Sequence, residues 1–317
     1  MGLRVLQPGL WATVQDLGRP GYRAWGVPIG GAFDLDAHTL ANALVGNSPR
    51  EATLELTLIG GLYEAESPLA LALAGAPMEA AIVAADGARR PLVVPQSFSL
   101  RPGDRLQLGG TPRGARAYLA ARGGWPTREV LGSRSSETAL APGDLLPAAP
   151  GEAPALRPAF AVRPEGESGP FRVVASAAEV DWGPLTFRVA PQSDRMGLRL
   201  EGPAPAVAPD PDRLSAPVAP GALQVAGGRL IVLGPACGTM GGYPVLAHVV
   251  TADLPRLGQL RPGDPLRFLP LSLADARRLD REHRRRRDAW ALTTSARSGC
   301  GPVGEGKEGR SPGGGLA

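Results

Sequence analysis

Short segments in which apolar and polar residues alternate follow one another along most of the chain. The clearest is Ala52–Leu58 (ATLELTL), which predicts a strand with Glu55 on its polar face. Residues 3–15 predict a strand, a Pro-Gly turn and a second strand. Further strands are predicted at Leu69–Ala74, Glu79–Ala84, Ser97–Leu100, Arg105–Leu108, Arg116–Ala121, Phe171–Ala175, Leu185–Val189, Leu198–Glu201, Ala222–Val225, Arg229–Leu233 and Val245–Val250. Because no strand–long helix unit recurs, we expect a mainly β fold with few short helices rather than a doubly wound parallel sheet.

Helical spacing is confined to two segments. Apolar residues recur at helical intervals in Asp34–Val45, and Gly46-Asn47 ends this pattern. Ser272–Trp290 predicts a second helix with Ser272 as its N-cap. We interpret its basic run, Arg284–Arg287, as a solvated helix end, since no aromatic residues are interleaved as in a nucleic-acid-binding surface.

An internal repeat indicates two related halves. LRPGDRLQL at Leu100–Leu108 recurs as LRPGDPLRF at Leu260–Phe268, and Arg-Pro-Gly-Asp favours a turn between two strands. We therefore expect two β-rich subdomains. The predicted boundaries are an N-terminal subdomain over 1–147, a Pro/Ala/Gly-rich linker over 148–170, a C-terminal subdomain with the basic helix over 171–293, and a disordered tail over 294–317.

The amino-acid composition excludes several kinds of catalytic and binding site. Glycine (43) and proline (34) make up about a quarter of the 317 residues, which favours short strands joined by tight turns. The single lysine is Lys307 in the tail, so the folded body has no lysine for a Walker-type phosphate loop, a Schiff base or its own biotin. Cys237 and Cys300 lie far apart and the three histidines are scattered, so we expect neither a metal site nor a structural disulfide.

Charge and hydropathy indicate where the protein acts. The net charge of +4 comes largely from the C-terminal arginines, so nucleic-acid binding by the body is not expected. We find no apolar run long enough to span a membrane and no signal-peptide core at the N-terminus. A cytoplasmic location without a membrane partner is therefore expected.

Three glycine-rich loops concentrate polar side chains: Gln15–Gly31, Gln192–Gly197 and Gly238–Pro244. In the first, Asp16 and Arg19 could pair with each other or take part in catalysis. Asp34 could be the N-cap of the following helix or a base. In the third loop, the backbone N–H groups of a Gly-Gly turn could bind an oxyanion, while Tyr243 could donate its hydroxyl or simply be a half-buried barrel residue. No Ser/His/Asp order, CxxC pair or GxGxxG after a strand is present.

Several of these stretches together resemble a known family. TVQDLGRPGYRAWGVPIGGAFDLDAHTLANALVGN, ATLELTLIGG, LRPGDRLQLG, RAYLAARGGW, QSDRMGLRLEGP and GGYPVLAHVVTADLPRLGQLRPGDPLRF are similar to the allophanate hydrolase subunit 2 family, in the family's order, over roughly residues 3–275. That family includes the C subunits of ATP-dependent 5-oxoprolinases, the KipA-type antagonists of a kinase inhibitor and part of the carboxyltransferase domain of urea carboxylase. The resemblance implies two β-barrel-like subdomains, one of them cyclophilin-like.

The resemblance also implies partners and a chemistry. The expected partners are a subunit 1 homologue, which is the KipI-like B component, and a LamB/YcsF-like A component, which together open 5-oxo-L-proline to L-glutamate at the expense of ATP. This chain is expected to be inactive alone, and the location of the ATP site stays open. The alternatives are a carboxyltransferase component that uses biotin or carboxybiotin from a separate carrier, and a regulatory protein that binds a kinase inhibitor.

Candidate roles follow from what these reactions require, which is donors for a developing oxyanion and an acid or base near an amide nitrogen. The catalytic candidates are Asp16, Arg19, Asp34, Asp194 and Arg195. The candidates for binding a small amide substrate are Gln15, Tyr22, Arg23, Ser193, Thr239, Gly241, Gly242 and Tyr243. Family members often have two threonines before Gly-Gly-Tyr-Pro. Here one of them is Met240, which weakens the case for chemistry in that loop.

Overall fold

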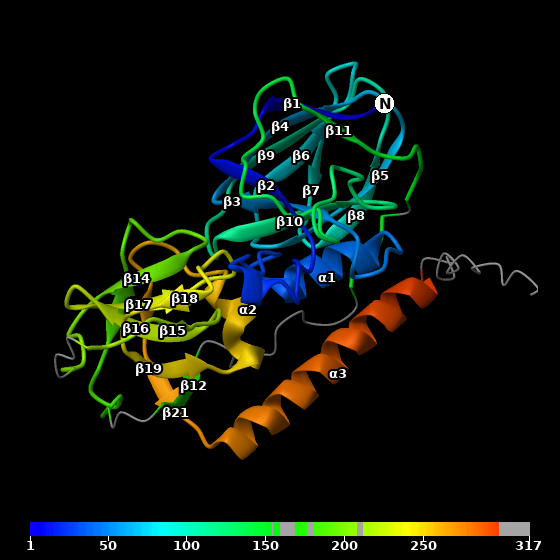
Figure 1. The fold of residues 1–317 in the computed structure, drawn as a ribbon. Helices are drawn as coiled ribbons and strands as arrows, with labels where there is room; N and C mark the ends of the chain where they lie inside the picture. Colours follow the sequence, from blue (N-terminus) through cyan, green and yellow to red (C-terminus); the bar gives the residue numbers. More distant parts are fainter. Residues whose placement is uncertain (154, 159–168, 177–179, 208–211, 298–317) are drawn as a thin grey trace, which may run out of the picture.

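A computed structural model describes residues 1–153, 155–158, 169–176, 180–207 and 212–297, with side chains up to Ala289. Two β units, one from each half of the chain, lie side by side, and a long C-terminal helix runs along both (Figure 1). The two units form the mainly β fold that the sequence predicts, and side chains from both meet at their junction.

The N-terminal unit consists of two antiparallel sheets. One sheet has the order β11-β1-β4-β9-β6-β7 and the other has the order β2-β3-β10-β5-β8. The strands are β1 (Gly2–Gln7), β2 (Trp11–Gln15), β3 (Thr53–Thr57), β4 (Ile59–Ala65), β5 (Leu69–Gly75), β6 (Ala80–Val83), β7 (Arg89–Leu92), β8 (Gln96–Leu100), β9 (Arg105–Gly110), β10 (Arg116–Ala121) and β11 (Leu145–Pro147). Both sheets direct their apolar alternate residues to one shared core.

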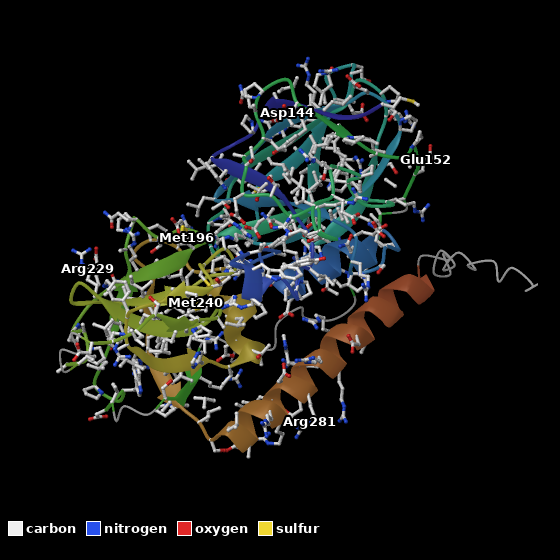
Figure 2. All side chains as sticks on the ribbon, in the orientation of Figure 1. Asp144, Glu152, Met196, Arg229, Met240 and Arg281 are labelled. Atoms are coloured by element: carbon white, nitrogen blue, oxygen red, sulfur yellow. The ribbon has the colours of Figure 1, made fainter. Side chains whose placement is uncertain are left out.

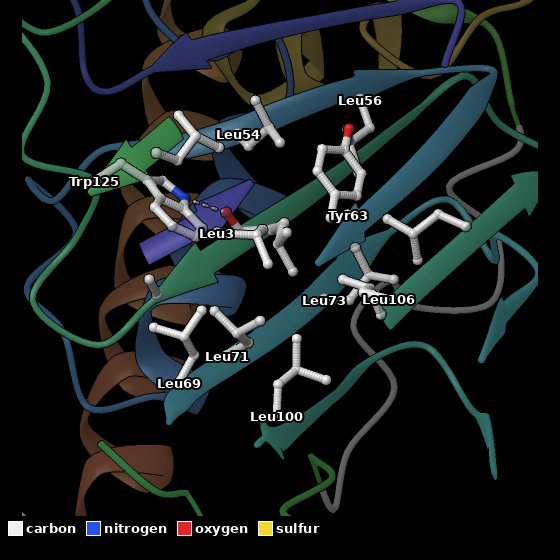
Figure 3. Packing of buried hydrophobic residues seen from close by; sticks show 14 of the residues in the cluster. Leu3, Leu54, Leu56, Tyr63, Leu69, Leu71, Leu73, Leu100, Leu106 and Trp125 are labelled. Carbon is white, nitrogen blue, oxygen red and sulfur yellow. Dashed lines mark hydrogen bonds between the residues drawn. The ribbon is translucent and has the colours of Figure 1, made fainter. Parts of the chain in front are cut away.

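Figure 3 shows the centre of this core, where leucines of both sheets surround Tyr63 and Trp125. Each of these two large side chains is fully buried and satisfies its polar atom internally. The Trp125 indole N–H donates to the Leu119 carbonyl at 2.9 Å, and the Tyr63 hydroxyl donates to the Gly60 carbonyl at 2.8 Å. The core therefore buries two large aromatic side chains without leaving the indole N–H or the hydroxyl unpaired.

The other face of the five-stranded sheet is covered by helix α1 (Leu35–Leu44). Small residues on β5 and β10, including Ala72, Ala74 and Ala120, let the apolar side of α1 approach closely. Asp34 precedes the helix and its carboxylate accepts from the N–H groups of Asp36 and Ala37, as the N-cap interpretation predicts.

The C-terminal unit is an eight-stranded sheet with the order β20-β13-β14-β17-β16-β19-β12-β21. Its strands are β12 (Phe171–Ala175), β13 (Phe187–Val189), β14 (Gly197–Glu201), β16 (Ala222–Ala226), β17 (Arg229–Leu233), β19 (Val245–Val249), β20 (Pro265–Leu266) and β21 (Phe268–Pro270). The two edge strands, β20 and β21, are separated in sequence by Arg267 alone. One continuous segment therefore pairs with both ends of the sheet, which curls it into a nearly closed barrel around its own core.

Two short elements of the C-terminal half lie outside the barrel sheet. A short ribbon of β15 (Ala216–Pro217) and β18 (Met240–Gly241) lies beside the barrel. The 3-10 helix η2 (Thr251–Asp253) and α2 (Leu254–Leu257) then lead the chain to the junction. In the predicted linker, Leu156 is hydrogen-bonded to Ser97 of β8, so this part of the linker is attached to the N-terminal unit.

Helix α3 (Leu273–Arg297) packs against both units. Ser272 accepts from the N–H of Asp275, as predicted for an N-cap. Ala276 packs near η2, and buried His283 lies 2.9 Å from the carboxylate of Asp36 on α1. The helix includes the first four residues of the segment predicted as a tail, and residues 298–317 lie outside the described residues.

Candidate functional site

The first glycine-rich loop lies at the junction and is closed at its neck by backbone hydrogen bonds. The N–H of Arg19 donates to the Ile29 carbonyl, and the N–H of Ala32 donates to the Asp16 carbonyl. Gly18 adopts φ +79°, and a Cβ there would lie 2.5 Å from the Ile29 carbonyl oxygen. Only glycine fits where the two ends of the loop approach so closely, which explains the glycine at position 18. At its far side, the N–H of Gly30 donates to the Pro235 carbonyl of the other unit.

Asp16 anchors a second segment to this loop. Its carboxylate accepts from the hydroxyls of Ser133 and Ser135, both at 2.6 Å, and from the N–H groups of Gly18 and Arg134. Burial alone would raise the pKa of Asp16, but these four hydrogen bonds outweigh it and hold the pKa below its ordinary value. A carboxylate with four donors positions the loop and is a weak proton acceptor at neutral pH.

Arg19 and Gln15 bind backbone carbonyls of the same neighbouring segment. Arg19 donates to the carbonyls of Val130 and Ser135, and no described ion pair joins it to Asp16. Gln15 is fully buried and donates to the Ser136 carbonyl at 2.8 Å. The oxygen of its side-chain amide has no hydrogen-bond partner among the described residues. Asp16 and Arg19 thus bind other groups among the described residues instead of each other, and the side chains of Arg19 and Gln15 hold the loop in place.

Glu55 is the centre of the junction. It is 1% exposed, because the polar face of β3, on which the sequence places it, is covered by the glycine-rich loop and the other unit. The carboxylate lies 2.6 Å from Arg195 and 3.3 Å from Arg116. Burial would raise the pKa of Glu55, but the two guanidiniums, with donors from Phe33 and Tyr118, hold the pKa below its ordinary value.

Arg195 crosses from the C-terminal unit to reach Glu55. Its guanidinium also donates to the Gly31 carbonyl at 2.6 Å and to the carboxylate of Glu137. Burial acts to lower the pKa of Arg195, but Glu55 and Glu137 raise it above the ordinary value. The predicted catalytic Arg195 is thus brought to the first loop, where all three of its nitrogens are bound by protein groups.

Asp34 is held by a residue of the other unit. Gln259, just after α2, donates to the Asp34 carboxylate at 2.7 Å and to the Arg116 carbonyl at 2.8 Å. Its own carbonyl oxygen accepts from the N–H groups of Ala115 and Arg116. The Asp34 N–H donates to the Tyr118 hydroxyl, whose pKa is raised by burial and by Glu55. Asp34 is therefore both a helix cap and part of the junction.

The second loop, Gln192–Gly197, sends only Arg195 into the junction. Asp194 is exposed, and its carboxylate accepts from the N–H groups of Met196 and Gly197, which closes its own turn. Ser193 exchanges hydrogen bonds with the backbone of Arg199. Figure 2 shows Met196 on the side of the C-terminal unit that adjoins the N-terminal one.

Arg23 brings the first loop against the third. It lies in the 3-10 helix η1 (Arg23–Trp25), and its guanidinium contacts the Thr239 carbonyl at 3.5 Å. One guanidinium nitrogen is buried without a partner among the described residues. Burial raises the pKa of the neighbouring Cys237 thiol, and Arg23 offsets part of that shift. Tyr22 stacks at a tilt on Trp25, with ring centroids 5.5 Å apart.

The Gly-Gly turn of the third loop belongs to the ribbon beside the barrel. Gly241 pairs with Ala216, and Tyr243 is 55% exposed, with its carbonyl accepting from Gln224. Gly242 is exposed. The structure thus places Gly242 and Tyr243 on an open surface and Gly241 half-buried beside Gln224, and their proposed contact with substrate stays a prediction.

A cavity of about 710 Å³ opens beside Asp34 and Gln259, within the size range typical of small-molecule sites. Its other polar side chains are Arg113 and Arg157, which sequence reasoning did not single out. Its remaining lining is Ala37, Gly75, Ala76, Pro77, Val93, Val94, Pro95, Gly114 and Pro158. Of the predicted catalytic and binding residues, Asp34 is the one that lines this cavity.

Two further findings concern the described residues alone. They contain no group of three or more His, Cys, Asp or Glu side chains arranged to hold a metal ion. None of their helices combines the length and the apolar character needed to cross a bilayer.

Comparison with known proteins gives consistent matches. The model of a family described as "Carboxyltransferase domain, subdomain A and B" matches residues 25–270. The chain is 32% identical to the 5-oxoprolinase C subunit of Escherichia coli K12, over 92% of this chain and 98% of that protein. The crystal structure of K. lactis urea amidolyase superposes with a TM-score of 0.77 at 27% identity, over 91% of this chain and 20% of that one. TTHA0988 gives a TM-score of 0.74 at 35% identity, over 84% of this chain and 56% of that one.

Proposed function

Because the chain belongs to the carboxyltransferase-domain family of subdomains A and B, we propose that it is the C subunit of a 5-oxoprolinase complex. In this proposal the complex uses ATP to open 5-oxo-L-proline to L-glutamate, and the chain is inactive alone. The observation that carries the proposal is the end-to-end match with the E. coli 5-oxoprolinase C subunit. The match to K. lactis urea amidolyase, in contrast, covers a fifth of that much longer chain.

The proposed complex includes a subunit 1 homologue and a LamB/YcsF-like component. A lactam is a poor electrophile, so ring opening needs activation of its carbonyl and proton transfer at its nitrogen. The donors of Arg195 bind protein groups, and Arg19 is held by backbone carbonyls, so we assign both to positioning the glycine-rich loop. Asp34 lines the cavity as a fully buried residue, and we assign its carboxylate to orienting Gln259 and to setting the charge of the substrate side.

Reconstitution tests this proposal. The chain is co-expressed with its subunit 1 homologue and the LamB/YcsF-like component, and glutamate is measured with and without ATP and 5-oxo-L-proline. We expect glutamate only when all three proteins and both small molecules are present. A well-formed complex of the three proteins that releases no glutamate contradicts the proposal.

A second candidate is a carboxyltransferase component that takes a carboxyl group from a biotin carrier. The fold similarity to urea amidolyase favours it. The discriminating assay adds a biotinylated carrier protein, biotin carboxylase, ATP, bicarbonate and urea to the chain with its subunit 1 homologue. Carboxylated urea from this mixture, with no glutamate from the first assay, would establish the second candidate instead.

A further inference from the structure

The arginines of the Asp34 cavity differ from those of the junction in having no carboxylate partner. Within the described part of the chain, no ion pair involves the guanidinium of Arg113 or Arg157, and both side chains are exposed. Both line the same cavity of about 710 Å³. We propose that this cavity binds an organic anion whose carboxylate is held by Arg113 and Arg157.

Arg157 is oriented for this role by a buried side chain. Gln96 is 5% exposed, and its carbonyl oxygen accepts from Nε of Arg157 at 3.2 Å and from the N–H of Val93 at 3.3 Å. This contact fixes the stem of Arg157, and no hydrogen bond to another described residue engages its two terminal nitrogens, which are therefore assigned to the ligand. Guanidinium nitrogens that carry two parallel N–H donors match the two oxygens of a carboxylate.

The rest of the lining is suited to an uncharged body. The apolar residues are Ala37, Ala76, Pro77, Val93, Val94, Pro95 and Pro158. An apolar lining with few polar groups is the usual composition of small-molecule sites, in which the polar groups set the orientation. The ligand therefore combines a carboxylate with a compact, uncharged ring or chain.

Asp34 limits the ligand to one negative charge. Asp34 lines the cavity but is fully buried, and its carboxylate is held by Gln259 and by the first turn of α1. A second carboxylate on the ligand would approach this buried charge in a partly desolvated space, where like charges repel strongly. An uncharged amide of the ligand, in contrast, meets no such repulsion.

The Gln259 side of the wall is preorganised. Gly114 has φ +69°, and a Cβ there would lie 2.7 Å from the Gln259 carbonyl oxygen, which is bound to the N–H groups of Ala115 and Arg116. Both the N–H groups and the oxygen of the Gln259 side-chain amide are thus engaged before a ligand arrives. A wall that needs no rearrangement lowers the ordering cost of binding.

5-Oxo-L-proline has these properties, because it is a monocarboxylate on an uncharged lactam ring; naming it as the ligand rests on the proposed function. The experiment is calorimetric titration of the full chain with 5-oxo-L-proline and with 2-pyrrolidinone, which has the same ring without the carboxylate. The variants are Arg113→Gln and Arg157→Gln. The matched control is Arg229→Gln, an exposed arginine on the outer end of the C-terminal unit (Figure 2).

We expect wild-type chain and the Arg229→Gln variant to bind 5-oxo-L-proline equally. Each cavity variant should bind it about tenfold or more weakly, which is the loss of a charge-assisted hydrogen bond. 2-Pyrrolidinone and the dicarboxylate L-glutamate should bind more weakly than 5-oxo-L-proline. Absence of 5-oxo-L-proline binding, equal binding of 2-pyrrolidinone, or unchanged affinity in both cavity variants would overturn the inference.

The proposed function is judged separately. The complex is also assembled with a chain that carries both Arg113→Gln and Arg157→Gln. If it forms glutamate with the KM of the wild-type complex, the proposed function is retained and the cavity is rejected as its site. No glutamate from the wild-type complex, together with arginine-dependent binding of 5-oxo-L-proline, would reject the function and retain the anion site.

Discussion

Arg113 and Arg116 are three positions apart in the chain, yet they lie in opposite environments. Arg116 is 5% exposed, stacks over the Phe33 ring and lies 3.3 Å from the Glu55 carboxylate. Arg113 is exposed and lines a cavity without an ion pair to any described residue. Arg116 also donates to the Gly258 carbonyl of the other unit at 2.6 Å, so a guanidinium engaged by protein groups builds the junction, whereas one without such partners is available to a ligand.

The largest effect is expected from Glu55→Gln. This change leaves the buried guanidiniums of Arg116 and Arg195 without their shared countercharge, and breaking a buried pair costs about 3–5 kcal/mol. Urea denaturation at neutral pH measures the loss in the free energy of unfolding. The matched control is Glu64→Gln, whose partly exposed pair with Arg105 should contribute less than about 1 kcal/mol. Similar losses for both variants would refute the distinction between the two environments.

Asp16→Asn is expected to cost about 1.5–3 kcal/mol at neutral pH, as for hydrogen bonds to a charged group. The folded state holds the pKa of Asp16 below its ordinary 3.8, so its stabilisation is present above about pH 4 and is lost as the pH falls through the lower folded value. The difference in unfolding free energy between wild type and the variant should therefore shrink from pH 7 to pH 3. A difference that stays constant over this range would show that the carboxylate charge is not responsible.

Two substitutions of Asp34 distinguish its role as a helix cap from its role beside the substrate. Asp34→Ala should lower stability by about 0.5–2 kcal/mol through loss of the helix cap, whereas Asp34→Ser, which can still cap α1, should retain most of it. We expect the complex with Asp34→Ser to lose glutamate formation all the same, because the carboxylate that holds Gln259 beside the cavity is gone. Full activity with Asp34→Ser would assign Asp34 to structure alone.

The smallest effect on stability is expected in the cavity. Arg113→Gln should change the free energy of unfolding by less than about 0.5 kcal/mol, as for a surface side chain without a partner. Arg116→Gln, its near neighbour in sequence, should cost several times more, because it removes a buried charge from Glu55. Thermal denaturation of the two variants in parallel measures this. Equal melting temperatures would contradict the assignment of separate roles.

Local features of the fold could be predicted from the sequence. Alternation located strands such as β3 and β5, and helical spacing after Asp34 located α1 together with its cap. Strand β4 was not predicted, because Gly60 and Gly61 interrupt its alternation. Both glycines are required by close contacts, in one case with Leu108 of a neighbouring strand, that only the tertiary structure reveals.

The junction could be predicted only in part. The glycine-rich loop and Arg195 were identified, but Glu55 was assigned to a polar strand face because alternation cannot tell a solvated face from one covered by another unit. Gln259 and Arg116 meet across 143 positions, and no local pattern specifies that contact. A charged residue in each of two mostly apolar strands, Glu55 in the middle of β3 and Arg116 at the start of β10, was an available signal.

A crystal structure of the full chain soaked with 5-oxo-L-proline tests most directly whether the arginines without carboxylate partners form the ligand site. We expect density for the ligand in the Asp34 cavity, with its carboxylate at the guanidiniums of Arg113 and Arg157 and the Glu55 cluster unchanged. Density for the ligand at the Gly241-Gly242 turn or beside Arg23, with this cavity empty, would contradict it.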